Sequence, residues 1–481
     1  MRLNSVNIEN YRSIENETLE VIEIEGGYTY TLIGINESGK SSFLKAISLK
    51  DGLEPVVNQD FYDSSKPISV TFNYSPIDEE QQSLREKLIE GGISNDSTEK
   101  FIIEEVKVII FVEPSEPITI KRKIEVTIKS KDPKKEAESE EKTSVKNFIE
   151  EQLLNTILEL AHKVVFWKSE QRFLITEPIN LEEFLKSPET ISIPLINCLE
   201  LAGIKSIESE IAKIRSNPAE VKNLANKLSD KVTEHIRRVW PGHPIKIEFQ
   251  IDNMSLSFLI EDEGVKYNAK VTSQRSDGFR QFVSFLLTIS AQNISGRLTN
   301  SILLLDEPET HLHPTGQENL MDELVNITLG KLNNVCIFAT HSNYMIDKKH
   351  LDRCFRLIKE GNQKTKIIPI DGSASSYAEV NYIVFGIVTS DYHNELYGFL
   401  QERENLFTEK EFEDYLSSKR MKKDKDYIKA LKDGKTQRYK VTPPTYIRHL
   451  IHHPENTNNK AFTRDELNQS VRFLADLKNE N

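Results

Sequence analysis

The chain has 481 residues, of which 28% are charged and 38% hydrophobic, values typical of a folded protein with two or three domains. Its formal net charge of -13 excludes binding of nucleic acid through overall charge, so such binding would require a local basic patch. The three cysteines, Cys198, Cys336 and Cys354, are odd in number and far apart, which indicates neither a disulfide framework nor a zinc site.

The first residues, MRLNSVNIENYRS, lack the apolar core of a signal peptide. The longest apolar runs, such as FVSFLLTI, are far too short to cross a membrane. We therefore expect a cytoplasmic protein that has no membrane partner.

Residues 1–144 are rich in predicted strands. Alternating or continuous apolar residues occur in LNSVNI, YTYTLIG, ISVTFNY, KVIIFV and KRKIEVTIK. The charged run KDPKKEAESEEKT, residues 131–143, is interpreted as a solvated loop rather than a site.

Residues 145–240 are predicted to form a helical insertion, with NFIEEQLLNTILELAHKVV and AEVKNLANKLSDKVTEHIRRV as its clearest helices. No heptad pattern continues through this range, which argues against a long coiled-coil arm. In residues 241–368, the predicted strands IKIEFQI, LSFLIED, SILLLDE and NVCIFAT are accompanied by helices in QFVSFLLTISAQ and after His313. This alternation predicts a parallel sheet with helical crossovers.

The segment GINESGKS, residues 34–41, matches the phosphate-binding pattern GxxxxGK[ST] and lies between the strand TYTLI and the helix SFLKAI, as that motif requires. Glycines allow backbone N–H groups to approach phosphates, Lys40 can reach the terminal phosphates, and the Ser41 hydroxyl can bind magnesium. The candidate nucleotide-binding residues of this loop are Gly34, Asn36, Gly39, Lys40, Ser41 and Ser42.

In SILLLDEPETHLHP, a buried strand ends at two carboxylates. We expect Asp306 to bind magnesium and Glu307 to polarise the attacking water. Capping of the next helix would explain the two acids if they stood alone, but not beside a phosphate loop. The next strand ends in FATHS, where His341 can act as a sensor of the terminal phosphate.

Taken together, NYRSI, GINESGKS, SDGFRQFVSFLL, LLLDEPETHLHP and FATHS resemble the ABC-type ATPases of the SMC-like group. The branch they resemble is that of the compact bacterial ATPases related to the OLD family, many of which serve antiphage defence. The resemblance covers roughly residues 1–75 and 245–360. It implies an α/β fold, a P-loop ABC-type ATPase head with a helical insertion, and ATP and Mg2+ as cofactors.

By the same resemblance, two ATPase heads sandwich the nucleotide, so a homo-oligomer of at least two chains is expected. Ser276 and Gly278 in RSDGF occupy the position of the signature motif, although the sequence departs from LSGGQ. An ordinary helix N-cap is the alternative interpretation of this stretch. The resemblance also implies that Arg12 approaches the nucleotide and that Gln59 is the glutamine that senses magnesium.

Residues 369–481 are predicted to form a mostly helical C-terminal module. Four of the eleven histidines lie here, three of them in TYIRHLIHHPENTNN. Pro454 disfavours helix at His453, so the helix is expected to end there, and PENTNN is interpreted as a turn.

The stretch R-H-x-x-H-H resembles the Rx4-6H motif of HEPN ribonucleases, with Arg448 and His453 as the matching residues. Histidine can take a proton near neutral pH, and arginine can stabilise charge that develops on a phosphate. His393 and Glu395 are further candidates for the same pocket.

Three interpretations of this module stay open. It is a ribonuclease, or a docking platform for a separately encoded effector nuclease, or a packing domain whose histidines are structural. A metal site is less favoured because no cysteine or HxxxH-plus-acid pattern reinforces it. A Toprim nuclease is rejected because Asp424 and Asp426 lie in a lysine-rich polar span.

The sequence therefore predicts an ATP-hydrolysing sensor of an antiphage, abortive-infection system. It would control a nuclease in its own C-terminal module or in a partner, with RNA or phage DNA as candidate nucleic acids. The alternative is a DNA repair or chromosome-handling SMC-like ATPase that has no nuclease. A transporter subunit would show a close LSGGQ match in a single compact body, and this sequence has neither.

Overall fold

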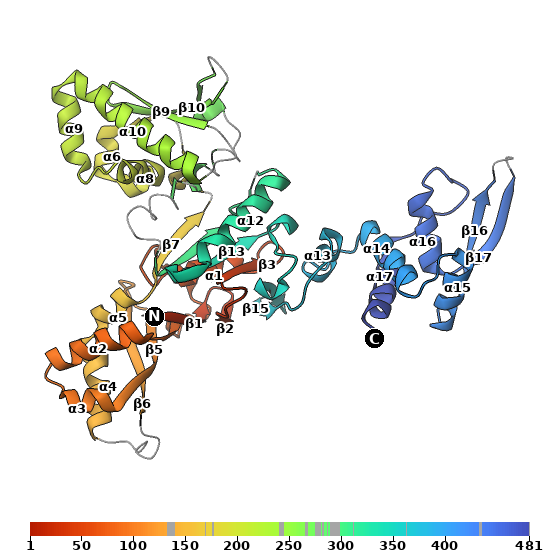
Figure 1. Cartoon of the computed structure of the whole chain (residues 1–481), viewed down its shortest axis with the longest axis horizontal. Coiled ribbons are helices and arrows are strands. Elements are labelled where there is room, and N and C mark those ends of the chain that lie inside the picture. Colours follow the sequence, from red (N-terminus) through yellow and green to blue (C-terminus); the bar gives the residue numbers. More distant parts are fainter. Residues whose placement is uncertain are drawn as a thin grey trace. The chain divides into compact units, whose positions relative to one another are not determined.

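The computed structural model describes most of the chain: residues 1–131, 140–168, 170–175, 178–239, 245–264, 268–274, 280, 283–285, 287–288, 299–310, 312–361, 363–431 and 435–480. The chain forms two compact units, unit 1 (Met1–Asp371) and unit 2 (Gly372–Asn481), and Figure 1 labels many of their elements. Within the described ranges, no helix is both long and apolar enough to cross a membrane.

A six-stranded sheet forms the centre of unit 1, with the strand order β15-β14-β3-β13-β12-β7. Its strands are β3 (Thr29–Ile33), β7 (Lys163–Lys168), β12 (Ser301–Asp306), β13 (Val335–Thr340), β14 (Cys354–Glu360) and β15 (Lys364–Pro369). All neighbouring pairs are parallel except β14 with β15. The predicted parallel sheet is confirmed for SILLLDE and NVCIFAT, but the strands IKIEFQI and LSFLIED pair with each other antiparallel in a separate sheet, so their inclusion was wrong.

Both faces of the central sheet are buried, which explains the unbroken apolar run in β12. Ile302 and Leu304 belong to one hydrophobic cluster together with helix α1 (Lys40–Ser48). Leu303 and Leu305 belong to a second cluster together with helix α12 (Pro314–Thr328). The two helices that flank the candidate site are therefore held by opposite faces of the same strands.

An antiparallel five-stranded sheet contributes its inner face to the first cluster. Its order is β2-β1-β4-β5-β6, and its strands are β1 (Arg2–Tyr11), β2 (Ile14–Glu20), β4 (Ile68–Ser75), β5 (Phe101–Val112) and β6 (Ile120–Ser130). The helices of this part are α2 (Asp78–Glu90), α3 (Asn95–Lys100), α4 (Glu140–Gln152) and α5 (Leu154–Leu160).

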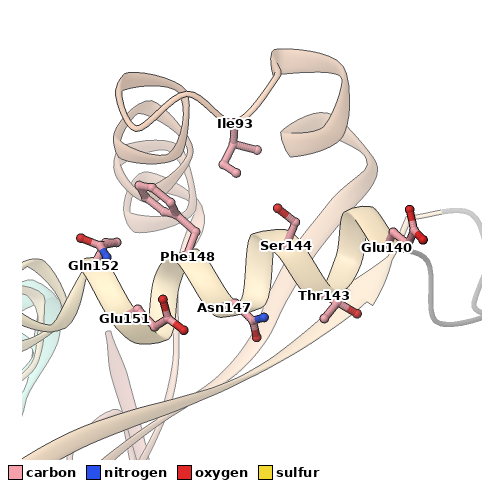
Figure 2. A pocket seen from close by; sticks show the side chains of 8 residues that line it. All are labelled: Ile93, Glu140, Thr143, Ser144, Asn147, Phe148, Glu151 and Gln152. Carbon is pink, nitrogen blue, oxygen red and sulfur yellow. The ribbon is translucent and has the colours of Figure 1, made fainter.

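A shallow hollow of about 700 Å³ lies on this part of the fold. Figure 2 shows Phe148 and Ser144 extending from α4 toward the segment that carries Ile93. None of the residues that line the hollow is a candidate site residue.

A third sheet, with the order β11-β10-β8 and with β9 paired to β10, packs with helices in the second cluster. The strands are β8 (Ile179–Asn180), β9 (Ile245–Asp252), β10 (Ser255–Asp262) and β11 (Lys270–Val271). The helices are α6 (Leu181–Lys186), α7 (Pro188–Ile191), α8 (Ile193–Leu201), α9 (Ile207–Ser216) and α10 (Pro218–Val239). Short 3-10 turns in unit 1 are η1 (Asn58–Asp60), η3 (Gln171–Phe173), η4 (Thr272–Gln274), η5 (Gly330–Leu332), η6 (Asn343–Met345) and η7 (Leu351–Arg353).

The prediction of a helix that continues through Val165 is wrong. The helical segment ends at Leu160, and β7 follows as an edge strand of the central sheet, in parallel register with β12. The apolar spacing of the few residues after Leu160 is consistent with either a helix or a strand. Pairing with β12 makes this segment a strand.

Two further predictions fall partly outside the described residues. Of the predicted loop at 131–143, residues 132–139 lie outside them, and Glu140–Thr143 form the first turn of α4. Most of the helix predicted in QFVSFLLTISAQ also lies outside them, and its described residues 283–285, 287 and 288 are helical.

Unit 2 has a hydrophobic core of its own. Its helices are α13 (Tyr377–Ile383), α14 (Ser390–Arg403), α15 (Glu409–Ser418), α16 (Pro443–His452) and α17 (Arg464–Asn479). An antiparallel hairpin of β16 (Lys425–Ala430) and β17 (Thr436–Val441) completes the unit. The prediction of a mostly helical C-terminal module is confirmed.

Candidate nucleotide-binding site

The phosphate loop joins the end of β3 to the start of α1. Gly39, the N-cap of α1, has φ of 109°, which an L side chain rarely adopts. A Cβ at Gly39 would lie 2.5 Å from Thr365 Oγ1, so the loop approaches β15 too closely for any other residue. Thr365 Oγ1 donates to Ser38 O at 2.8 Å and lies 2.8 Å from Ser13 Oγ. This bracing residue of the loop gave no signal in the sequence.

Lys40 is buried, and its ammonium group contacts residues of the phosphate loop and His341. Its Nζ donates to Gly34 O at 3.0 Å and lies 2.9 Å from His341 Nε2. Burial lowers the pKa of Lys40, although Glu307 and Asp306 act in the opposite direction. The structure thus brings the loop lysine and the predicted sensor histidine into direct contact.

Ser41 and Asp306, the two predicted magnesium ligands, meet across the sheet edge. Ser41 Oγ donates to Asp306 Oδ1 at 3.0 Å. Burial raises the pKa of Asp306, while the hydrogen bond from Ser41 lowers it. A hydroxyl and a carboxylate that converge in this way provide the oxygen ligands that Mg2+ prefers, so these residues fit the ion.

Glu307 follows the tip of β12 in a left-handed backbone conformation, with φ of 52°, and such strain is often found at functional sites. Its Oε1 lies 3.2 Å from His341 Nε2. Burial, together with the charge of Lys40, lowers the pKa of His341, which favours the neutral ring. An unprotonated Nε2 can accept from Lys40, whereas a protonated one can donate to Glu307.

Glu309 is a buried carboxylate beside this pair that the sequence analysis did not single out. Its Oε1 accepts from Thr340 Oγ1 and from the backbone N–H of His341. Its other oxygen is buried without a hydrogen-bond partner among the described residues. Burial raises the pKa of Glu309 to about 7. The only feature of the sequence that could have pointed to Glu309 is that it is the third acid in DEPE.

Arg12 and Gln59 lie close to each other, and Arg12 also lines the cavity of the phosphate loop. Arg12 Nε donates to the buried Asp60 at 2.7 Å, and Arg12 N donates to Asp60 O at the same distance. Gln59 is exposed in η1 next to Asp60, and it lines a hollow of about 500 Å³ together with Arg12 and Ser13. Asp60 therefore positions the arginine.

A cavity of about 710 Å³ contains most of the predicted nucleotide-binding residues. Its lining consists of Arg12, Ser13, Asn36, Glu37, Ser38, Gly39, Lys40, Ser41, Ser42, Glu307, His341 and Lys359. Lys359 was not predicted, and burial lowers its pKa. Ser276 and Gly278, the candidate signature residues, lie outside the described residues.

The C-terminal candidates occupy the end of α16, which stops at His452 with His453 as its C-cap, and residues of PENTNN form turns, as predicted. Arg448 is half-buried, and its guanidinium lies 4.4 Å above the ring of Tyr397. His452 and His453 are exposed, and His453 Nδ1 lies 3.2 Å from Glu455 Oε1. Burial lowers the pKa of His452, and the neighbouring charges of Arg448 and the adjacent histidines add to this effect.

His393 is not accessible to a substrate in the structure. It is fully buried, its Nε2 lies 2.9 Å from Ser470 Oγ, and burial lowers its pKa to about 4. Glu395 accepts a hydrogen bond from Ser376. These two residues are therefore better explained as structural than as part of a pocket with His453.

The positions of the described residues do not support a metal site or a Toprim nuclease in the C-terminal module. Asp426 lies within β16 and pairs with Arg438 at 2.9 Å, rather than standing at the end of a strand. Within the part of the chain that the structure describes, no three His, Cys, Asp or Glu side chains are grouped so that they could hold a metal ion.

The arrangement at the carboxyl edge of the central sheet is that of a P-loop nucleotide-binding domain with a carboxylate pair and a neighbouring histidine. A family model described as "AAA domain, putative AbiEii toxin, Type IV TA system" matches residues 30–347, well over half of the chain. The chain belongs to this family. The resemblance to ABC-type ATPases related to the OLD family is thereby confirmed.

Two curated relatives match parts of the chain. The Old nuclease of Escherichia phage P2 is 25% identical over 386 residues, which are 75% of this chain and 60% of that protein. An uncharacterized protein of Methanocaldococcus jannaschii is 29% identical over 137 residues, 27% of this chain and 35% of that protein. The chain thus spans less than two thirds of the length of either relative.

Solved SMC heads are similar to part of the structure. An Smc head bound to the C-terminal winged-helix domain of ScpA has a TM-score of 0.42 at 14% identity, over 77% of this chain and 98% of that one. The SMC head domain of Thermotoga maritima has a TM-score of 0.36 at 11% identity, over 77% of this chain and all of that one.

Proposed function

We propose that this chain is the ATP-binding and ATP-hydrolysing component of an antiphage, abortive-infection system, and that its nucleotide state controls a nuclease. The observation that carries the proposal is the convergence of Lys40, Ser41 with Asp306, and Glu307 with His341 at one sheet edge. Membership in a family whose description mentions the AbiEii toxin, and similarity to the phage P2 Old nuclease, support the defence role.

Each residue at this edge has a chemical task in the proposed reaction. Lys40 would hold the terminal phosphates, and Ser41 and Asp306 would bind the magnesium ion, which supplies charge neutralisation when present. Glu307 would orient and deprotonate the attacking water. His341 would leave its contact with Lys40 to donate to the terminal phosphate.

The nucleotide site would be completed by a second copy of the chain. Ser276 and Gly278 would be the residues that one head lends to its partner, with Arg12 and Gln59 acting within the same head. Asn36, exposed in the loop, and Ser42, partly buried in α1, line the cavity that such a partner would face.

The nuclease would reside in unit 2 or in a separately encoded partner. The single experiment that decides between them incubates the purified chain with total tRNA, with and without ATP and Mg2+. His453→Ala is the decisive variant, because His453 is exposed and its loss should leave the fold intact, whereas Arg448→Ala also removes packing on Tyr397. His452→Gln, which changes the adjacent exposed histidine, is the matched control.

Cleavage that is lost in His453→Ala and in the Arg448→Ala, His453→Ala double variant assigns the nuclease to this chain. ATP turnover without cleavage in any nucleotide state assigns it to a partner. Phage plating tests the defence role itself: protection by the wild-type gene should disappear with Lys40→Ala. Equal plaque counts for both genes would overturn the proposal and favour a DNA repair or chromosome-handling ATPase.

A further inference from the structure

Positive charge in this acidic chain is concentrated in one segment of unit 2. Residues 419–440 contain ten Lys or Arg and only three Asp. The rest of residues 372–481 contain seven Lys or Arg and fourteen Asp or Glu. Because the whole chain has a net charge of -13, the segment is the kind of local patch that binding of a polyanion would require.

The segment begins directly after α15, its described residues include the strands of the β16–β17 hairpin as far as Lys440, and the hairpin exposes cations. Tyr427 and Val441 are buried on the inner side of the hairpin. Arg438 and Lys440 are exposed on its outer side, two residues apart on one face of β17. Lys429 is exposed nearer the tip, on the face that carries Tyr427.

Part of this charge is paired: Lys419 with Glu480, Lys423 with Asp414 and Lys425 with Glu466. The pair on the outer side of the hairpin is the most exposed. Arg438 lies 2.9 Å from Asp426, with 66% and 44% of the two side chains exposed. Ion pairs between such exposed groups contribute little to stability, since water screens them and both side chains lose freedom. A phosphate can therefore replace Asp426 as the partner of Arg438 at small cost.

The hairpin is joined to the histidine end of α16. The rings of Tyr427 and His449 stack with centroids 4.4 Å apart. Asn456, in the turn that follows His453, donates to Ile428 O at 2.8 Å, and Asn459 accepts from Ile428 N at the same distance. The exposed imidazoles of His452 and His453 thus lie at the end of a helix that is fastened directly to the basic hairpin.

We infer that the β16–β17 hairpin and the histidine end of α16 form a binding surface for the phosphodiester backbone of a nucleic acid. Spaced cations on an extended ribbon suit the backbone of a flexible single strand better than the flat surface of an acidic protein. The inference deepens the proposed function, on which its biological role rests, but binding itself requires no ATP turnover.

The test measures binding without catalysis. Fluorescence anisotropy follows a labelled single-stranded RNA of about 30 nucleotides, a DNA strand of the same sequence and the corresponding DNA duplex. The full chain is used in EDTA without nucleotide, across a range of salt concentrations. The test variant is Lys429→Ala, Arg438→Ala, Lys440→Ala. The matched control removes the same charge from the exposed face of β6 in unit 1, with Lys121→Ala, Lys123→Ala, Lys129→Ala.

The test variant should weaken binding of the preferred strand at least tenfold at low salt. It should also reduce the slope of log K against log salt by about 2, since each lost phosphate contact removes roughly 0.7 from the slope for a single strand. The control variant should change neither quantity. The RNA and DNA arms then identify the nucleic acid that the surface prefers.

Three results would overturn the inference. The control variant could weaken binding as much as the test variant, or the wild type could fail to bind at low salt. The protein could also bind poly-glutamate more tightly than any nucleic acid. The last result would assign the surface to an acidic protein. Lys40→Ala should retain full binding, so a failure of the ATPase proposal stays distinguishable from a failure of this surface.

Discussion

At the scale of single residues, the phosphate loop lysine is already engaged by the protein. Its Nζ contacts the carbonyl groups of Gly34 and Ile35 as well as His341. A bound triphosphate would have to replace these neutral partners, and its negative charge makes that exchange favourable. His341, released from Lys40, is then free to turn toward the phosphate or toward Glu307.

Replacing Glu307 by Gln should remove the proposed general base while leaving nucleotide binding intact. We expect phosphate release to fall roughly 10²- to 10⁴-fold, the usual contribution of a general base, and ATP-bound oligomers to accumulate. Phosphate-release kinetics and size-exclusion chromatography with ATP measure the two effects. Glu323→Gln, on the exposed face of α12, is the control, and unchanged turnover in Glu307→Gln would show that another residue is the base.

Glu309 should make stability depend on pH. Burial raises its pKa to about 7, whereas a glutamate in an unfolded chain titrates at about 4.3. Between these values the folded state keeps a proton that the unfolded state releases, so stability present at low pH is lost as pH rises toward 7. Glu309→Gln stays neutral and can still accept from Thr340.

The free energy of unfolding of Glu309→Gln, relative to wild type, should therefore increase from pH 5 to pH 8 in urea titrations. Glu183→Gln, at an exposed position on α6, should show no such trend. A constant difference between Glu309→Gln and wild type across this range would mean that Glu309 stays ionised in the folded protein.

At the scale of elements, the parallel register of β3, β12 and β13 explains why motifs far apart in sequence meet. The ends of these strands lie at one edge of the sheet, so the phosphate loop, the carboxylate pair and His341 are neighbours. β15, which is not one of these three strands, supports the phosphate loop as well, because Thr365 contacts both Ser38 and Ser13. The loop is thus held from two sides.

Gly39 and Thr365 should be energetically coupled. Gly39→Ala forces an L side chain into φ of 109° and places its Cβ against Thr365 Oγ1, so we expect a loss of about 1–2 kcal/mol from the backbone alone and more from the contact. Thr365→Ala removes that oxygen and should destabilise less in the Gly39→Ala background than in wild type. Urea unfolding of the four proteins measures the coupling, and additivity within about 0.5 kcal/mol would contradict it.

The sequence was sufficient for the parts of the site that follow a local pattern. A strand followed by GxxxxGK[ST] and a helix, and an apolar strand that ends in two acids, identify Lys40, Ser41, Asp306 and Glu307 because the chemistry and the chain positions coincide. Asp60, Glu309 and Thr365 could not be found in this way, since their partners are defined only by how distant segments pack. The strand β7 was missed for a related reason: its identity depends on pairing with β12, not on its own spacing.

At the scale of the whole molecule, the hydrophobic clusters divide where the two units divide. The clusters of the central sheet contain residues of unit 1 only, and those around α14, α17 and the hairpin contain residues of unit 2 only. Charge divides as well, because residues 372–481 contain equal numbers of acidic and basic residues while the chain as a whole has a net charge of -13. Each unit therefore has its own hydrophobic core, and the two units differ in net charge.

Unit 2 should therefore fold without unit 1. Residues 372–481 expressed alone should unfold cooperatively in circular dichroism, because a core of this size is sufficient for a domain of about 100 residues. A shorter fragment, residues 390–481, loses α13 with the buried Val380, the ring contact of Tyr382 with Tyr392, and the ion pair of Glu379 with Lys478.

The loss of α13 tests whether the boundary lies before it. Each kcal/mol of stability corresponds to about 4–8 °C in the melting temperature of a domain of this size, and three buried contacts should together contribute a few kcal/mol. We expect the shorter fragment to melt at least 10 °C below the longer one. Equal melting temperatures would place α13 outside the folded unit, and a longer fragment that unfolds without a cooperative transition would show that its core requires unit 1.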